Sequence, residues 1–406
     1  MRNEKKLIGL LFVVILTISI MAGCGEKDNS AIDEDYTAVE MEDGVDEGEQ
    51  SAGEMEEPII IGCETSLTGE KALTGEYMKN ALDLAVERIN ADGGLLGRKV
   101  QVILEDDQGT DQGAVNAYNK LASSGACVVI GNLYSTMNVA ISGEVEKAGL
   151  PTIVTGSSVS VGKLNNPYMF QARTNDDVAV RAIVNRAIND MGFKNIAIIH
   201  DSDAYGQGAC EVAMNTLKEM GIEPVVVATY NSGDKDFTAH ISQIQHSEAD
   251  VILAFSLQTE AGLIMKQLSV MDNKLPIIGS TSYASAIAIE LAGDASNGVY
   301  SVVDYVPTTP LGAGQEFAEL YKEKYGIESD WSGAAAWDSF LIVTEAIKRA
   351  GSTDAEAICN EIANLKDFEG ASNIFSFDEN HIGGTMNVFV QIENQSPKVL
   401  GTASAK

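Results

Sequence analysis

Five short segments rich in hydroxyl side chains have the composition expected for binding a small polar molecule. Each follows directly after a short apolar run, and they are Thr65-Ser66, Ser135-Thr136, Thr155 through Ser160, Asp201 through Tyr205, and Ser280-Thr281-Ser282. Free backbone N–H groups at helix starts, together with neighbouring hydroxyls, suit a carboxylate or another small polar group. A single Ser or Thr of this kind is better explained as a helix N-cap. Five such segments together favour a binding cleft.

The same segments lack the residue sets that catalysis or metal binding usually needs. No nucleophile–base pair is visible, so we do not expect an enzyme. The chain has four histidines, and His240 and His246 do not have the spacing of a helical metal pair, so we expect no metal site. A G-x-x-x-x-G-K-[ST] phosphate loop is absent from the sequence, and we expect no cofactor.

Apolar runs alternate with amphipathic helical patterns from Pro58 onward, and these elements must position the hydroxyl-rich segments. The apolar runs lie at residues 59–61, 100–104, 128–130, 153–154, 196–199, 225–227, 251–253 and 277–278. Helical patterns lie at 75–90, 114–123, after 135, and at 177–191, 314–325 and 332–349. Runs that are apolar on both faces indicate parallel strands covered by helices on each side. Ligands of such sheets bind beyond the carboxyl ends of the strands, where the hydroxyl-rich segments stand.

A break near Arg173-Thr174-Asn175 divides the strands into two series. The sequence therefore predicts an α/β protein with two doubly wound parallel-sheet lobes, joined by a hinge that the chain crosses several times. The helices at 314–325 and 332–349 have no strand series of their own and should return to the first lobe. We expect residues 58–175 and 306–378 in the first lobe, and 176–305 and 379–406 in the second.

The N-terminal residues have the layout of a secretory signal peptide. A basic start precedes the uncharged, mostly apolar run 7–21, which is short for a membrane span of about 20 residues. Residues Met21-Ala22-Gly23-Cys24 resemble a bacterial lipobox, in which Cys24 becomes the lipidated first residue of the mature chain. We expect residues 1–23 to be removed and Cys24 to anchor the protein outside the cytoplasmic membrane. The alternative is an uncleaved anchor helix with an incidental Cys.

Residues 24–57 should form an acidic, disordered linker. Fourteen Asp or Glu residues and the single base Lys27 lie between Glu26 and Glu57, with few large apolar residues. Such a segment buries too little surface to offset its chain entropy. The whole chain has a net charge of -32, and because like charges repel the phosphate backbone, we expect no nucleic-acid partner. Beyond Cys24, the widely spaced Cys63, Cys127, Cys210 and Cys359 are expected to be free thiols.

Four stretches resemble the branched-chain amino-acid-binding family of type I periplasmic solute-binding proteins. They are Thr68-Gly69 with Gly75, Ile89 through Arg98 (INADGGLLGR), His200 through Gly206 (HDSDAYG), and Gly233 through Phe237 (GDKDF). The resemblance extends from Pro58 to nearly the end of the chain. It implies the two-lobed fold of that family and a ligand held between the lobes.

The resemblance also implies roles for single residues. Ser135 matches the family's carboxylate-binding Ser, with Thr136 beside it. The loop with Thr155, Ser157, Ser158 and Ser160 matches the second contact loop, and either Ser158 or Ser160 is its ligand hydroxyl. Tyr205 matches an aromatic residue that packs over the ligand.

Other positions depart from the family pattern. Thr281 stands where the family has an acid for the ligand ammonium, and Asp304 is the candidate to replace that acid. The usual aromatics match Thr74 and Leu257, and the usual disulfide positions match Tyr134 and Gly109. These departures leave the identity of the ligand open.

The resemblance implies a clamp that closes on an amino acid or amino-acid-like ligand and delivers it to an ABC permease. We expect a monomer that reaches the membrane through its lipid anchor. A ligand-binding sensor for a small carboxylate or amide is the alternative.

Overall fold

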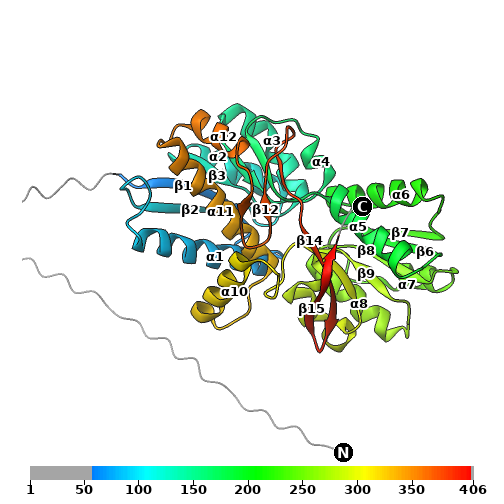
Figure 1. The fold of residues 1–406 in the computed structure, drawn as a ribbon. Helices are drawn as coiled ribbons and strands as arrows, with labels where there is room; N and C mark the ends of the chain where they lie inside the picture. Colours follow the sequence, from blue (N-terminus) through cyan, green and yellow to red (C-terminus); the bar gives the residue numbers. More distant parts are fainter. Residues whose placement is uncertain (1–56, 404–406) are drawn as a thin grey trace, which may run out of the picture. The chain divides into compact units, whose positions relative to one another are not determined.

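The computed structural model describes residues 57–403, which form two sheets with helices around each (Figure 1). The first sheet has the order β13-β5-β4-β3-β1-β2. All of its strand pairs are parallel. Its strands are β1 (Ile59–Thr65), β2 (Val100–Asp106), β3 (Val128–Ile130), β4 (Thr152–Val154), β5 (Met169–Thr174) and β13 (Ile382–Gly384).

The second sheet has the order β15-β14-β10-β9-β8-β6-β7. Its strands are β6 (Ile196–Asp201), β7 (Val226–Tyr230), β8 (Val251–Phe255), β9 (Ile277–Gly279), β10 (Tyr300–Val303), β14 (Asn387–Glu393) and β15 (Ser396–Ala403). The five strands β6 to β10 are mutually parallel, whereas β14 and β15 run antiparallel at one edge. A separate hairpin contains β11 (Phe368–Glu369) and β12 (Ile374–Phe375).

Twelve α-helices connect these strands within the described residues. They are α1 (Ala72–Ala91), α2 (Asp111–Ala122), α3 (Ser135–Ala148), α4 (Val159–Gly162), α5 (Asp176–Asn185), α6 (Ala204–Glu219), α7 (Thr238–Gln245), α8 (Gln258–Val270), α9 (Ala286–Ala292), α10 (Gly312–Tyr325), α11 (Trp331–Ala350) and α12 (Ala355–Ala363). A π-helical turn, η1 (Arg186–Asp190), continues α5, and a short 3₁₀ turn, η2 (Thr281–Ala284), follows β9. The expected helix 177–191 is thus α5 together with η1.

Side-chain and glycine caps explain where several helices begin and end. Asp203 begins α6 because its Oδ1 accepts a hydrogen bond from the N–H of Gly206 (2.7 Å). Asp330 caps α11 in the same way by accepting from Ser332 N (3.1 Å). After α1, Gly94 has a φ of 85° and lies against Arg98 O, where a Cβ would come within 2.0 Å. Glycine is required there, and it turns the chain toward β2.

Three strands of the second sheet, β6, β8 and β9, are buried on both faces. Along β6, Ile196 and Ile198 pack into one hydrophobic core, and Ala197 and Ile199 pack into another on the opposite face. Because successive side chains of a strand point to opposite faces, such a strand reads as a continuous apolar run. The apolar runs of the sequence therefore predicted these strands correctly, and the α/β fold with two parallel-sheet lobes is confirmed.

The chain crosses between the sheets three times, after β5, after β10 and after β13. As predicted, α10 and α11 return to the first lobe, where Phe317 and Phe340 share a core with Ile61 and Val129. The third crossing lies later than the expected division between residues 378 and 379. Strand β13 still pairs with β5 in the first sheet, so the chain changes lobe between residues 384 and 387.

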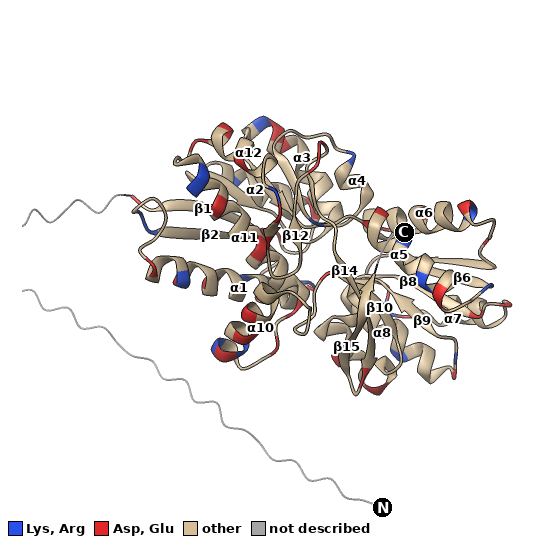
Figure 2. Ribbon diagram, viewed as in Figure 1, with Lys and Arg blue, Asp and Glu red and all other residues tan. Residues whose placement is uncertain are grey.

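The signal peptide 1–23, Cys24 and nearly all of the acidic linker 24–57 lie outside the described residues. Within residues 57–403, no helix is long and apolar enough to span a bilayer. The four cysteines of this part of the chain form no disulfide with one another. Burial raises the pKa of the Cys210 thiol to about 11, so it stays protonated at neutral pH. Charged residues lie mainly on the helices and loops around the sheets (Figure 2).

Candidate functional site

A small cavity lies between the two lobes, and both lobes contribute to its wall. From the first lobe come Leu133, Tyr134, Ser135, Ser157, Arg173 and Trp331, and from the second come Tyr205, Leu257, Gln258, Thr281 and Ser282. The cavity volume is about 20 Å³, which is room for about one water molecule. A larger solute therefore enters only when the lobes separate or the lining side chains move.

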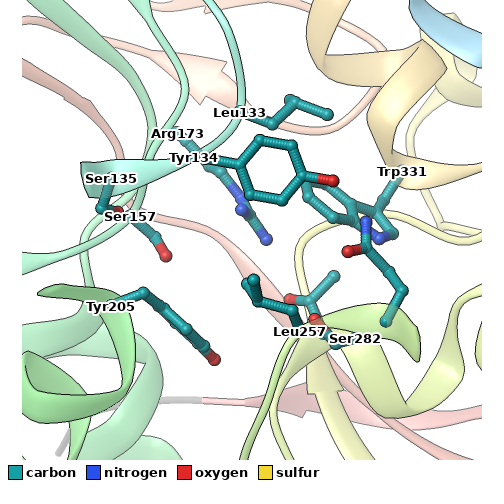
Figure 3. A pocket seen from close by; sticks show the side chains of 11 residues that line it. Leu133, Tyr134, Ser135, Ser157, Arg173, Tyr205, Leu257, Ser282 and Trp331 are labelled. Atoms are coloured by element: carbon teal, nitrogen blue, oxygen red, sulfur yellow. The ribbon is translucent and has the colours of Figure 1, made fainter. Parts of the chain in front are cut away.

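The wall residues stand at the carboxyl ends of parallel strands. Ser135 is the first residue of α3 after β3, Ser157 follows β4, and Tyr205 lies in the first turn of α6 after β6. In this position the unpaired N–H groups of a helix start are available to an anion. Figure 3 shows Ser135, Ser157 and Tyr205 along one side of the cavity and Trp331 on the other, with the guanidinium of Arg173 between them.

Four of the residues singled out in the sequence, Ser135, Ser157, Tyr205 and Thr281, line this cavity. Thr136 lines a larger outer hollow instead. Thr155 is buried, and its hydroxyl donates to Asn132 O (3.3 Å), which ties two loops of the first lobe together. The first-lobe serines are connected as well, because Ser158 N donates to Ser135 Oγ (3.2 Å).

Ser158 and Ser160 do not line the cavity, although one of them was expected to supply the ligand hydroxyl of this loop. The hydroxyl of Ser158 donates to Ala204 O of the second lobe (2.9 Å). Ser160 donates to Ser158 Oγ from its backbone N–H (3.2 Å) and its hydroxyl (2.9 Å). In this arrangement Ser157 presents its side chain to the cavity, and Ser158 joins the two lobes.

Asp304 is close to the cavity but is held in an ion pair. Arg173 Nε donates to Asp304 Oδ2, and both side chains are buried. Thr281 Oγ1 lies 3.5 Å from Asp304 Oδ1. Asp304 itself does not line the cavity. Its carboxylate therefore neutralises Arg173, and it is not displayed to a ligand as a free acid.

Sequence reasoning missed four residues of the wall: Leu133, Arg173, Gln258 and Trp331. Arg173 stood in the segment that marked the lobe boundary, and no local signal there pointed to a ligand contact. The guanidinium of Arg173 lies over the Trp331 ring, 4.1 Å from its centroid. Gln258 and Trp331 are the first residues of α8 and α11. Their closeness depends on the tertiary fold, which local sequence patterns do not reveal.

Several buried polar atoms at the cavity have no hydrogen-bond partner. On the wall these are Gln258 Nε2 and Trp331 Nε1, and near it are Asp176 Oδ2 and Ser280 Oγ. Burial raises the pKa of Asp176 to about 7, although Arg173 acts in the opposite direction. Buried polar groups are nearly always paired in folded proteins, so unpaired ones gathered at one cavity indicate a place for a polar ligand.

An outer hollow of about 840 Å³ adjoins the cavity and shares Tyr134, Leu257 and Gln258 with it. At its edge Lys235 of the second lobe pairs with Glu70 of the first (2.8 Å). Both side chains are exposed, so solvent screens this pair and it adds little to closure. The hollow is open enough to be the entrance to the cavity.

A family model described as periplasmic binding protein matches residues 58–397. This chain belongs to the periplasmic binding protein family. The Leu/Ile/Val-binding protein BraC3 of Rhizobium johnstonii is 27% identical over 324 residues, which covers 79% of this chain and 88% of that protein.

Two solved structures show the same fold in similar binding proteins. The branched-chain amino acid transporter substrate-binding protein LivJ of Streptococcus pneumoniae, in complex with isoleucine, has a TM-score of 0.79 and 25% identity, and the match covers 86% of this chain and 99% of LivJ. The leucine-binding protein LivK of Thermotoga maritima has a TM-score of 0.78 and 25% identity, and covers 85% of this chain and 99% of LivK. These relatives are named as binding proteins and not as enzymes, and membership of the family implies an extracytoplasmic location.

Proposed function

We propose that this periplasmic binding protein is a lipid-anchored clamp that binds an amino acid or amino-acid-like carboxylate and delivers it to an ABC permease. One observation carries the proposal: a single cavity is walled by Ser135 at the start of α3 in one lobe and by Tyr205 of α6 in the other. A solute in that position contacts both lobes only when they are closed. The expected monomeric state forms part of the proposal.

Closure follows from the difference in contacts between the open and closed forms. The carboxylate first meets the open amides of α3 and the hydroxyl of Ser135, and the second lobe then brings Tyr205 over the ligand. Because the ligand interacts with both lobes only in the closed form, it shifts the equilibrium toward that form. The hinge consists of the three chain crossings, which confine the motion to rotation of one lobe against the other.

The names of the relatives support a ligand of the amino-acid class. Leu133 and Leu257 supply an apolar part of the wall, which suits an aliphatic or aromatic side chain. The lipid anchor rests on the lipobox-like residues ending at Cys24. The acidic linker would hold the body away from the negatively charged cell envelope.

A thermal-shift screen tests this function. Amino acids, their 2-oxo acids and small aryl carboxylates are each added to the purified residues 57–406. A ligand at 100 times its dissociation constant adds about 2.7 kcal/mol to the free energy of unfolding. We expect at least one compound of the panel to raise the melting temperature by several degrees. No shift with any member of the panel would contradict the proposed function.

A further inference from the structure

The described residues that line the cavity offer no free negative charge to a ligand. Arg173 is its one cation, and no Asp or Glu occurs among the described residues that line it. Asp304 balances Arg173 within their ion pair. An ammonium group placed in this cavity would have no counter-charge, and a buried charge without a partner is strongly disfavoured.

Two other carboxylates near the cavity are engaged elsewhere. Asp330 accepts from Ala286 N (3.0 Å) and from Ser332, and Asp203 accepts from Gly206 N. Asp176 Oδ2 and Asp201 Oδ2 have no hydrogen-bond partner, and Asp176 is the one that interacts with the wall residue Arg173. Asp176 does not line the cavity, and its backbone N–H donates to Ser157 O (2.8 Å). Asp176 is therefore the one carboxylate that could accept a hydrogen bond from a ligand ammonium, and its role is tested with Asp176→Asn.

The unpaired groups on the wall point to an acceptor on the ligand. Trp331 Nε1 has one N–H and can only donate, and Gln258 Nε2 carries two N–H groups. Both side chains are buried, with exposed fractions of 6% and 4%. Trp331 belongs to α11 of the first lobe and Gln258 to α8 of the second. A ligand oxygen that accepts from both would hold the closed lobes together.

On the basis of the proposed function, we propose that the site selects a carboxylate without an α-ammonium group, of the 2-oxo acid type. Trp331 and Gln258 are then specificity-determining residues that donate hydrogen bonds to the ligand's acceptor oxygens. The carboxylate lies against Ser135 and the start of α3. A 2-oxo group is an acceptor and carries no charge, so it meets the unpaired donors and needs no counter-ion.

Leucine and 4-methyl-2-oxopentanoate test this inference, because they share one carbon skeleton and differ only in the ammonium and oxo groups. Isothermal titration calorimetry of the purified protein measures both dissociation constants. We expect the oxo acid to bind at least about tenfold more tightly than leucine. Equal or tighter binding of leucine would overturn the inference and leave the proposed function intact. If neither these two compounds nor any other member of the screening panel binds, both the inference and the proposed function fail.

Trp331→Phe removes the N–H donor and keeps a ring beneath Arg173. We expect it to weaken the oxo acid about tenfold and leucine less. The matched control is Trp337→Phe, because Trp337 is a core residue of α11 that does not line the cavity. Its dissociation constants should stay within about twofold of the unsubstituted protein. Gln258→Met, which keeps side-chain length, supplies a second test if Trp331→Phe lowers the melting temperature too far.

Asp176→Asn tests whether Asp176 accepts a ligand ammonium or whether the site has no partner for that group. If Asp176 received a ligand ammonium, this substitution would abolish leucine binding and reverse a preference for leucine. The inference instead requires that the preference for the oxo acid persists in Asp176→Asn. Loss of that preference in this variant would overturn it.

Discussion

The guanidinium of Arg173 lies between two partners, the Trp331 ring at 4.1 Å and the Asp304 carboxylate. Arg173 lies near the end of β5 and Asp304 directly after β10, where the chain crosses between the lobes, and Arg173 also lines the cavity. The group thus connects the hinge to the wall of the site.

Arg173→Met should be strongly destabilising, because it leaves Asp304 as a buried charge without a partner. We expect the free energy of unfolding to fall by about 3–5 kcal/mol in urea titrations. Lys79→Met is the control, since Lys79 pairs with Asp83 on the exposed face of α1 and should cost less than about 0.5 kcal/mol. In Arg173→Met/Asp304→Leu the loss should be smaller than in Arg173→Met. Additive losses would show that the two side chains are not coupled.

Gly208→Ala should hinder closure of the lobes. A Cβ at Gly208 of α6 would lie 2.5 Å from Ser158 Oγ, the hydroxyl that donates across the cleft to Ala204 O. We expect weaker ligand binding and a larger radius of gyration in the presence of ligand, measured by small-angle X-ray scattering. Gly143→Ala is the matched control, because Gly143 is also helical and has nothing within 4 Å of the added Cβ. That variant should bind normally and gain up to about 1 kcal/mol of stability. Identical scattering from both variants would contradict the steric argument.

Ser135→Ala should weaken a carboxylate ligand by roughly 10- to 100-fold. The reason is the loss of a charge-assisted hydrogen bond, which contributes about 1.5–3 kcal/mol. Calorimetry with the best ligand of the thermal-shift screen measures this change. Ser142→Ala, two turns further along α3 and away from the cavity, should bind normally. Unchanged affinity in Ser135→Ala would remove this serine from the site.

Asp176 should make the protein less stable as the pH rises from about 4 to 7. Its pKa is raised to about 7 in the folded chain, mainly by burial, against about 3.9 in the unfolded chain. The folded state therefore binds more protons than the unfolded state in this range, so stability falls as pH rises. Each pKa unit corresponds to about 1.4 kcal/mol. Melting temperatures of Asp176→Asn should depend less on pH over this window, and an unchanged profile would contradict the assignment.

Cys24→Ala should release the protein from the membrane fraction, because the lipid would have no attachment residue. Fractionation of cells and partitioning into detergent measure this change. Cys359→Ala is the control, since Cys359 is a half-buried free thiol of α12 and should leave the protein with the membrane. Retention of Cys24→Ala in the membrane would favour the uncleaved anchor helix instead.

Apolar runs predicted β1 to β4 and β6 to β9 because burial leaves a signal in the local sequence, but they missed the parallel strands β5, β10 and β13. The run at Val251 to Leu253 is an example, since all of β8 is buried. Strands β14 and β15 were not predicted: in β15, buried or half-buried residues alternate with exposed ones, as at Val399 and Leu400. An edge strand with one solvated face lacks the continuous apolar run.

Only those residues of the candidate site that directly follow a predicted strand could be predicted from the sequence. Ser135 and Tyr205 follow apolar runs, so their place at one edge of each sheet was predictable. Trp331 and Gln258 line one cavity from positions 73 residues apart, and nothing in the local sequence marks that arrangement. The role of Ser158 could not be predicted either. Its hydroxyl donates to Ala204 O of the second lobe, and the sequence alone does not show how the two lobes face each other.

The third crossing has a consequence for the order of assembly. Strand β13 forms an edge of the first sheet, and β14 and β15 form an edge of the second. Both sheets therefore remain unfinished until residues 382–403 have been made. A chain of this topology cannot complete either half early during synthesis.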